Sequence, residues 1–250
     1  MLSSLFIRGL SVQGSVPEDD YVARLPVVRH LRSMGGLTFT RPVTFFIGEN
    51  GMGKSTLIEA MALCAGFNAE GGSINFNFST RASHSGLYRC LRLVRGAQRN
   101  LDGFFLRAES FYNVATNVDD LDDGRLLPYY GGTSLHSQSH GESFLSLIEH
   151  RFAGHGLYIL DEPEAALSPM KLMTLMVLMD QLVKDGSQFF ISTHSPILMT
   201  FPGAEILELS ANGIRPVQYR DTEHFQITKR FLDAPERMLA ALGLGGSEVP

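Results

Sequence analysis

Short apolar runs alternate with longer segments of helical periodicity along this chain. The apolar runs predict β-strands, because runs of this length bounded by polar residues or glycine are typical of strands. The predicted strands span Leu5–Leu10, Val43–Ile47, Gly103–Arg107, Leu157–Leu160, Gln188–Ile191 and Glu205–Leu209. Runs such as Leu157–Leu160 contain no charged position, which indicates central parallel strands that are covered on both faces.

The longer segments predict helices at Lys54–Ala65, Glu142–Arg151, Ser168–Asp185 and Thr222–Ala241. Because strands and helices alternate, the sequence favours an α/β domain with a mostly parallel sheet. The most apolar stretch, Leu172–Val183, is too short to span a membrane and contains Asp180. We expect it to form a buried helix. Its methionines are expected to fill gaps in the core rather than bind a cofactor; they are Met170, Met173, Met176 and Met179.

Length and composition suit one α/β domain with a sizeable core, since the chain has 250 residues and is 44% hydrophobic. We expect a single domain over 1–250, with an inserted lobe at 70–123, where helix signals are weak, and a helical tail at 222–250. The net charge of −5 argues against general nucleic-acid binding. Two cysteines, Cys64 and Cys90, match no zinc motif and form no disulfide framework. We therefore expect a soluble, cytoplasmic protein, and the N-terminus reads as a strand rather than a signal peptide.

The stretch GENGMGKST at 48–56 fits the pattern G-x-x-x-x-G-K-[ST]. Its glycines allow the backbone N–H groups to turn inward and bind phosphate oxygens, and the following helix adds its positive end. Lys54 is expected to reach the β- and γ-phosphates, and the Ser55 hydroxyl to ligate Mg²⁺. The alternative is a chance glycine-rich turn, which lacks the strand before and the helix after that are predicted here. The predicted nucleotide-binding residues of this loop are Glu49, Asn50, Gly51, Gly53, Lys54, Ser55 and Thr56.

A second strand, Leu157–Leu160, runs directly into Asp161 and Glu162. Asp161 at the strand tip is expected to hold the Mg²⁺ shell. Glu162, one residue further out, is placed to polarise a water that faces the γ-phosphate. The alternative is a solvated acidic turn that starts the next helix; the phosphate loop upstream favours the functional interpretation.

These motifs resemble those of the ABC-type ATPase superfamily, and most of all stand-alone bacterial ATPases of ABC-like or AAA type and the heads of SMC-like repair ATPases. The segment 48–56 is similar to the Walker A motif, and 157–162 to Walker B with its catalytic glutamate. The resemblance implies a P-loop NTPase fold, an ABC-type head with a mostly parallel central sheet and an additional β or irregular lobe. It also implies that Lys54, Glu162 and a switch histidine, His194, are catalytic.

The segment Ser139–Ser143 lies where the family carries its signature motif, with Gly141 twenty residues before Asp161. The resemblance implies that Ser139, Gly141 and Glu142 contact nucleotide that is bound by a second copy. The segment departs from the family pattern, because His140 replaces the first glycine of the usual pair. Glu164–Ser168 occupies the position of the D-loop.

The glutamine of the family's Q-loop is also missing, and Glu109 is the candidate substitute as a metal ligand. These departures weaken the interpretation as a transporter subunit most, since transport ATPases meet their membrane partners at the Q-loop.

The predicted function is Mg²⁺-dependent binding and hydrolysis of ATP in a nucleotide-sandwich homodimer, which acts as a switch on an unknown protein or nucleic-acid partner. Two alternatives remain open. One is the ATP-binding subunit of a membrane transporter, and the other is a nucleotide-gated interaction module with little turnover.

Three further features lie outside these motifs. Between Gly71 and Leu101 there is no acidic residue, while five arginines occur, which indicates either a phosphate-binding surface for nucleic acid or a solvated lobe; they are Arg81, Arg89, Arg92, Arg95 and Arg99. Tyr21 or another N-terminal aromatic residue is a candidate for stacking on adenine. The remaining histidines, His224 among them, have no metal-ligand spacing, and we expect surface or local hydrogen bonds for them.

Overall fold

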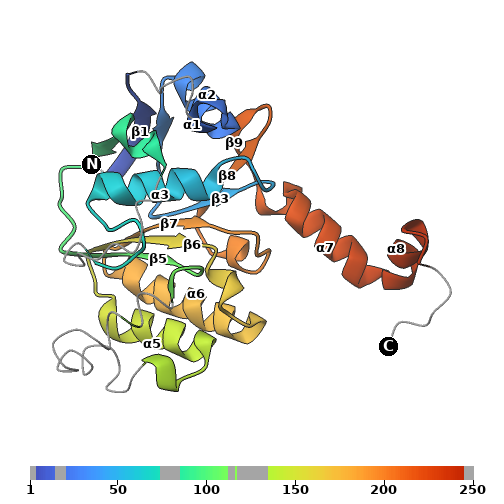
Figure 1. The fold of residues 1–250 in the computed structure, drawn as a ribbon. Helices are drawn as coiled ribbons and strands as arrows, with labels where there is room; N and C mark the ends of the chain where they lie inside the picture. The colour runs from blue at the N-terminus through green and yellow to red at the C-terminus, as the bar shows by residue number, and fades with distance from the viewer. Residues whose placement is uncertain (1–3, 15–20, 74–84, 112–115, 117–134, 245–250) are drawn as a thin grey trace.

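The structure is a computed structural model, and it describes residues 4–14, 21–73, 85–111, 116 and 135–244. A six-stranded sheet forms the centre of the molecule, in the order β5-β6-β7-β3-β8-β9 (Figure 1). All neighbouring pairs are parallel except β8 and β9, which form an antiparallel hairpin. The strands are β1 Ile7–Val12, β2 Leu37–Thr38, β3 Val43–Ile47, β4 Leu91–Arg95, β5 Asp102–Arg107, β6 Gly156–Asp161, β7 Gln188–Ser192, β8 Glu205–Ser210 and β9 Gly213–Pro216.

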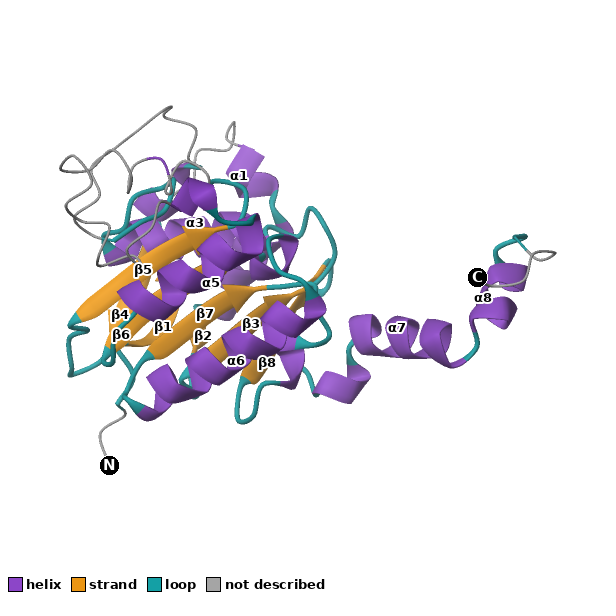
Figure 2. Cartoon of the chain, turned by 90° about the horizontal axis from the view of Figure 1, so that it is seen from below, coloured by secondary structure: helices purple, strands orange, loops and turns teal. Residues whose placement is uncertain are grey.

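Helices cover both faces of this sheet. The helix α3 and the shorter α2 lie on one face, and α5 and α6 lie on the other (Figures 1 and 2). The described helices are α1 Tyr21–Arg24, α2 Pro26–Met34, α3 Lys54–Ala65, α5 His140–Arg151, α6 Pro169–Lys184, α7 Glu223–Asp233 and α8 Pro235–Ala241. Each face has its own hydrophobic core, because successive strand residues point to opposite sides: Phe45 belongs to the α5–α6 side and Phe46 to the α2–α3 side.

The predicted α/β fold with a mostly parallel sheet is confirmed. All five residues of β3 and β7 and all six of β6 are buried, as expected for strands that are covered on both faces. The observed β3 and α3 coincide with the predicted ranges, whereas β1 begins two residues later than predicted, at Ile7.

A small antiparallel sheet, β2-β1-β4, lies beside the main one. It is joined to the main sheet by the buried Gln188, whose amide oxygen accepts hydrogen bonds from Phe6 N and Ile7 N at 2.9 and 3.0 Å. Within the segment 70–123, which the sequence predicts as an inserted lobe, the described strands join both sheets: β4 pairs with β1, and β5 pairs with β6.

Helix α6 differs from the predicted buried helix. Its inner face buries Leu172, Leu175 and Met179, but Met170 and Met173 are 70% and 46% exposed. The expectation that all four methionines fill the core is therefore wrong. The helix carries apolar residues on all its faces, which is a pattern typical of a fully buried helix. Only one of these faces packs on the sheet.

The predicted helix Thr222–Ala241 is two helices, α7 and α8. The break falls at Ala234, because the following Pro235 lacks an N–H group and disfavours helical backbone in the residue before it. Both helices extend away from the body of the molecule in two perpendicular views (Figures 1 and 2). No helix in the described ranges is long and apolar enough to cross a bilayer.

Candidate nucleotide site

The loop between β3 and α3 can be built only with glycine at two of its positions. Gly48 has φ +135°, and a Cβ added there would lie 2.1 Å from the Leu209 carbonyl oxygen of β8. Gly53 has φ +94°, and its Cβ would lie 2.6 Å from Val27 Cγ1 of α2. The chain therefore curls tightly between β8 and α2, with the N-terminus of α3 directly behind it.

Lys54 is buried within this loop. Its Nζ donates hydrogen bonds to the carbonyl oxygens of Gly48 and Glu49, at 2.7 and 3.0 Å. Burial lowers the pKa of the ammonium, while the nearby carboxylates of Glu162 and Asp161 act in the opposite direction. The positive charge thus lies inside the loop and faces the acidic tip of β6.

Asp161 ends β6 and is buried. Ser192 at the end of β7 donates a hydrogen bond to its Oδ1, and Arg107 at the end of β5 contacts its Oδ2 through Nε at 3.1 Å. The other side of the Arg107 guanidinium contacts Glu59 Oε2 of α3 at 3.0 Å. The two carboxylates outweigh burial and raise the pKa of Arg107, so the group stays charged.

Sequence reasoning missed Arg107 and Glu59. For Arg107 the sequence shows only that it ends a predicted strand, and its pairing with Asp161 depends on β5 lying next to β6 in the sheet. For Glu59, which lies within the apolar pattern of α3, the sequence offers no signal.

A cavity of about 220 Å³ brings the predicted metal ligands together. Ser55, Asp161 and Glu109 line it, together with Thr56 and Glu162. Tyr21, at the start of α1, lines it as well and is 59% exposed.

A hydroxyl and carboxylates suit Mg²⁺, which needs few protein ligands when phosphates and water complete its shell. The described residues contain no group of three His, Cys, Asp or Glu side chains that could hold a metal ion. Ser55 and Asp161 therefore fit an Mg²⁺ site that is completed by nucleotide.

Glu162 follows Asp161 in left-handed backbone, with φ 50°. Such a conformation is costly for glutamate and occurs most often at functional sites. Its N–H donates to the Ser192 carbonyl oxygen at 3.1 Å, and its Oε1 lies 3.8 Å from His194 Nε2. Burial and the neighbouring Asp161 raise the pKa of Glu162, which strengthens its basicity.

His194 is held by the segment that precedes α6. The buried carboxylate of Glu164 accepts hydrogen bonds from Thr193 Oγ1 at 2.9 Å and from the backbone N–H of His194 at 2.5 Å. His194 Nδ1 also lies 3.1 Å from Nε2 of His224, in the first turn of α7. The expectation of a surface or local role for His224 is wrong, because this hydrogen bond spans thirty residues of the chain.

The predicted signature residues lie at the start of α5, on the sheet face opposite α3 (Figure 1). Ser139 N and Oγ both donate to the Glu142 carboxylate, at 3.0 and 2.5 Å, and cap the helix. These hydrogen bonds lower the pKa of Glu142. A Cβ on Gly141 would lie 2.9 Å from the Ala166 carbonyl oxygen, so glycine lets α5 approach the segment before α6. The structure does not bring these three residues to the chain's own phosphate loop.

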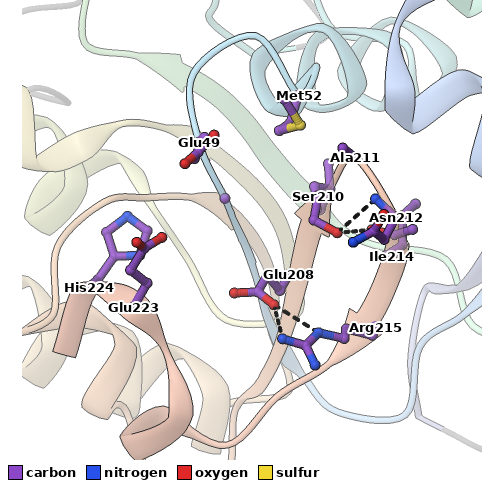
Figure 3. Close-up of a pocket in the computed structure, with 13 residues that line it drawn as sticks. Glu49, Met52, Glu208, Ser210, Ala211, Asn212, Ile214, Arg215, Glu223 and His224 are labelled. Atoms are coloured by element: carbon purple, nitrogen blue, oxygen red, sulfur yellow. Dashed lines mark hydrogen bonds and ion pairs between the residues drawn. The ribbon is translucent and has the colours of Figure 1, made fainter. Parts of the chain in front are cut away.

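A larger cavity of about 550 Å³ lies against the phosphate loop (Figure 3). Glu49 and Met52 of the loop form one wall, the β8–β9 hairpin another, and Glu223 and His224 of α7 a third (Figure 3). A smaller adjoining space is lined by Asn50 and His194. Both ends of the phosphate loop are therefore open to ligand-sized cavities.

Comparison with known proteins agrees with this geometry. Residues 30–95 match the family described as "AAA domain", and residues 127–200 match the family described as "AAA domain, putative AbiEii toxin, Type IV TA system". The chain is 26% identical over 207 residues to the "Ribose import ATP-binding protein RbsA" of Jannaschia sp. (strain CCS1). This match covers 71% of the chain but only 39% of the relative.

Two solved structures are similar over most of their length. One is cbiO1 from Clostridium perfringens, part of the ABC transporter complex cbiONQ, with 16% identity, coverage of 96% and 99% of the two chains, and a TM-score of 0.49. The other is the SMC head domain from Thermotoga maritima, with 15% identity, coverage of 86% and 100%, and a TM-score of 0.44.

The fold assignment rests on the strand order and on two motifs, the phosphate loop after β3 and the Asp161–Glu162 pair at the end of β6. The chain is a P-loop ATPase of the AAA/ABC type. The expectation of an ATP-binding enzyme is thereby confirmed at the level of this class.

Proposed function

We propose that the protein binds Mg-ATP at the β3–α3 loop and hydrolyses it in a sandwich of two copies. The observation that carries the proposal is the convergence on one cavity of Ser55, Asp161 and Glu162, with His194 Nε2 3.8 Å from Glu162 Oε1. Lys54 lies buried in the adjoining loop. Phosphate, cation and attacking water have separate sets of partners in this arrangement.

On ATP binding, Lys54 exchanges its hydrogen bonds with the loop carbonyls for the β- and γ-phosphates. The backbone from Glu49 to Gly53 and the hydroxyl of Thr56 cradle the remaining oxygens. Ser55 and Asp161 would hold Mg²⁺, and the bound ion would supply positive charge to the phosphates. Glu109 lines the same cavity, where it would contact this ion through a water molecule or position the attacking water.

Glu162 takes a proton from the attacking water, and its raised pKa brings it closer to the operating pH. His194 donates a hydrogen bond to the γ-phosphate or to that water. Glu164 holds the loop that carries His194 to the loop that carries Glu162, so that both move as a unit.

The second copy supplies Ser139, Gly141 and Glu142. These residues lie at the N-terminus of α5, whose positive end favours a phosphate. Because α5 lies on the face of the sheet opposite α3, away from the phosphate loop of its own chain, these residues complete a site across an interface. Loss of the γ-phosphate then weakens the dimer, so nucleotide state sets assembly state.

In the proposal, a partner protein or nucleic acid responds to this assembly state. The setting is the cytoplasm, where Cys64 and Cys90, which form no disulfide, stay reduced. A transport role, as the name of the ribose-import relative states for that protein, is less favoured because the signature and Q-loop segments depart from the family pattern. Nucleic acid is the second candidate partner, since four arginines on and around β4 are exposed; they are Arg89, Arg92, Arg95 and Arg99. Arg81 lies outside the described residues.

Phosphate release from the full chain tests the enzymatic part of the proposal. Glu162→Gln should lower kcat by about 10²- to 10⁴-fold, the range for loss of a general base, with little change in ATP affinity. Lys54→Ala should abolish ATP binding itself. Glu149→Gln is a matched control, because Glu149 is an exposed carboxylate in the last turn of α5. Equal turnover of wild type and Glu162→Gln would contradict the assignment.

A further inference from the structure

The contact between His194 and His224 joins the catalytic segment to the projecting helix. His194 follows β7, and His224 lies in the first turn of α7. The two rings share one hydrogen bond, between His194 Nδ1 and His224 Nε2, at 3.1 Å. Among the described residues, His194 Nε2 is buried and has no hydrogen-bond partner, although the side chain as a whole is 33% exposed.

Both rings are neutral near pH 7. Burial lowers the pKa of His194, and the positive charge of Lys54 lowers it further. The same two causes lower the pKa of His224, in spite of Glu223 and Glu208. A neutral imidazole has one N–H donor and one acceptor nitrogen, so the hydrogen bond between the rings fixes which nitrogen of His194 carries its proton.

The surroundings of His194 Nε2 select one of the two tautomers. Glu162 Oε1 lies 3.8 Å from this nitrogen. A carboxylate oxygen attracts an N–H group and repels a nitrogen lone pair. Nε2 therefore carries the proton, Nδ1 is the acceptor, and His224 Nε2–H is the donor.

The first turn of α7 is anchored firmly enough to hold His224 in place. Thr222, which is fully buried, caps the helix by accepting from Phe225 N at 3.2 Å, and it donates to the Tyr219 carbonyl oxygen at 2.7 Å. The rings of Phe225 and Tyr219 pack with centroids 4.8 Å apart. Beyond this turn α7 is exposed on all sides.

We propose that His224 is a positioning residue for ATP hydrolysis: it donates to His194 Nδ1 and so keeps the Nε2–H of His194 directed at the reacting phosphate or water. The inference rests on the proposed function, because it assumes that His194 donates a hydrogen bond to a bound nucleotide or to the attacking water. It also makes α7 part of the catalytic apparatus, since the helix that projects from the body begins with the residue that orients His194.

Two variants separate the hydrogen bond from packing. His224→Phe keeps an aromatic ring in the first turn of α7 but removes the donor. His224→Gln restores an N–H donor at the same distance along the side chain. His150→Phe is the control, because His150 is exposed on α5 and bonds only within its own helix among the interactions described.

The first readout is ¹⁵N NMR of the histidine rings in the nucleotide-free protein, with His194 assigned by loss of its signal in His194→Gln. Wild type and His224→Gln should show His194 protonated on Nε2, and His224→Phe should show a mixture of tautomers. Protonation on Nδ1 in wild type, or an unchanged signal in His224→Phe, would overturn the inference even if no ATP is hydrolysed.

The second readout is steady-state kinetics. His224→Phe should lower kcat by about 10- to 100-fold, the range for loss of an outer partner of a catalytic ligand, with KM for ATP unchanged. His224→Gln should recover most of this loss, and His150→Phe should behave as wild type. If wild type turns over ATP and His224→Phe keeps the wild-type kcat, the positioning role is wrong while the proposed function stands.

Discussion

Replacement of Arg107 by methionine tests whether the ion pairs beneath the catalytic carboxylates stabilise the fold. The guanidinium lies between Glu59 and Asp161, at 3.0 and 3.1 Å. The three side chains are 19%, 11% and 5% exposed, respectively. Methionine retains much of the aliphatic volume but leaves two largely buried carboxylates without their cation.

Breaking a buried ion pair by removal of one partner costs about 3–5 kcal/mol. The adjoining cavity of about 220 Å³ admits water to this site, so the lower value of about 3 kcal/mol is the better estimate. For a chain of this size each kcal/mol lowers Tm by about 2–4 °C, which gives a loss of about 6–12 °C. Mg-ATP should recover part of the loss, because a cation again faces Asp161.

Thermal melts of the nucleotide-free protein, followed by circular dichroism, measure this effect. Lys184→Met is the matched control, since Lys184 is 72% exposed and its ion pair with Asp180 contributes at most about 1 kcal/mol. A Tm for Arg107→Met within about 2 °C of both wild type and the control would refute the reasoning, because the charges would then be as well solvated as surface ones.

Two further predictions concern parts of the fold that position the site. Arg151 and Tyr158 donate to Asp102, each at 2.8 Å, and against the effect of burial they hold the pKa of Asp102 below its usual value. Asp102→Asn should therefore lower the free energy of unfolding by about 1–3 kcal/mol at pH 7. This loss should become smaller as the pH falls below about 4 and the wild-type carboxylate becomes protonated. Urea unfolding at pH 7 and pH 3 measures the loss, and an equal loss at both pH values would contradict the prediction. Gly48→Ala should abolish ATP binding in a titration with fluorescent nucleotide, because its Cβ would meet the Leu209 carbonyl at 2.1 Å, whereas Gly66→Ala, with φ +101° and nothing within 4 Å, should bind as wild type.

The sequence predicted the elements whose pattern is local. The strands β3, β6 and β7 are continuous apolar runs, and the phosphate loop between β3 and α3 has glycine where backbone contacts leave no room for a side chain. These features depend on neighbours within a few residues, so periodicity and spacing reveal them. Helix α2 was missed although Pro26 at its first position and the buried Val27, Val28 and Leu31 mark it.

The contacts that orient the catalytic groups were beyond such reasoning. Arg107 meets Glu59 and Asp161 across intervals of 48 and 54 residues, and His194 meets His224 across thirty. Only the order of strands in the sheet and the path of the chain after β9 bring them together. The exposure of Met170 and Met173 has a similar origin, since it depends on which face of α6 the sheet covers.

The central claim is that ATP joins two copies of the chain. Molar mass of Glu162→Gln, measured by light scattering with Mg-ATP, with Mg-ADP and without nucleotide, tests it most directly. The account predicts a dimer with Mg-ATP alone and a monomer of 27.5 kDa in the other two conditions. Ser139→Ala and Gly141→Ala, each placed in the same background, should prevent the shift. A variant that binds ATP while its mass remains that of a monomer would contradict the assignment of Ser139, Gly141 and Glu142 to the opposing nucleotide.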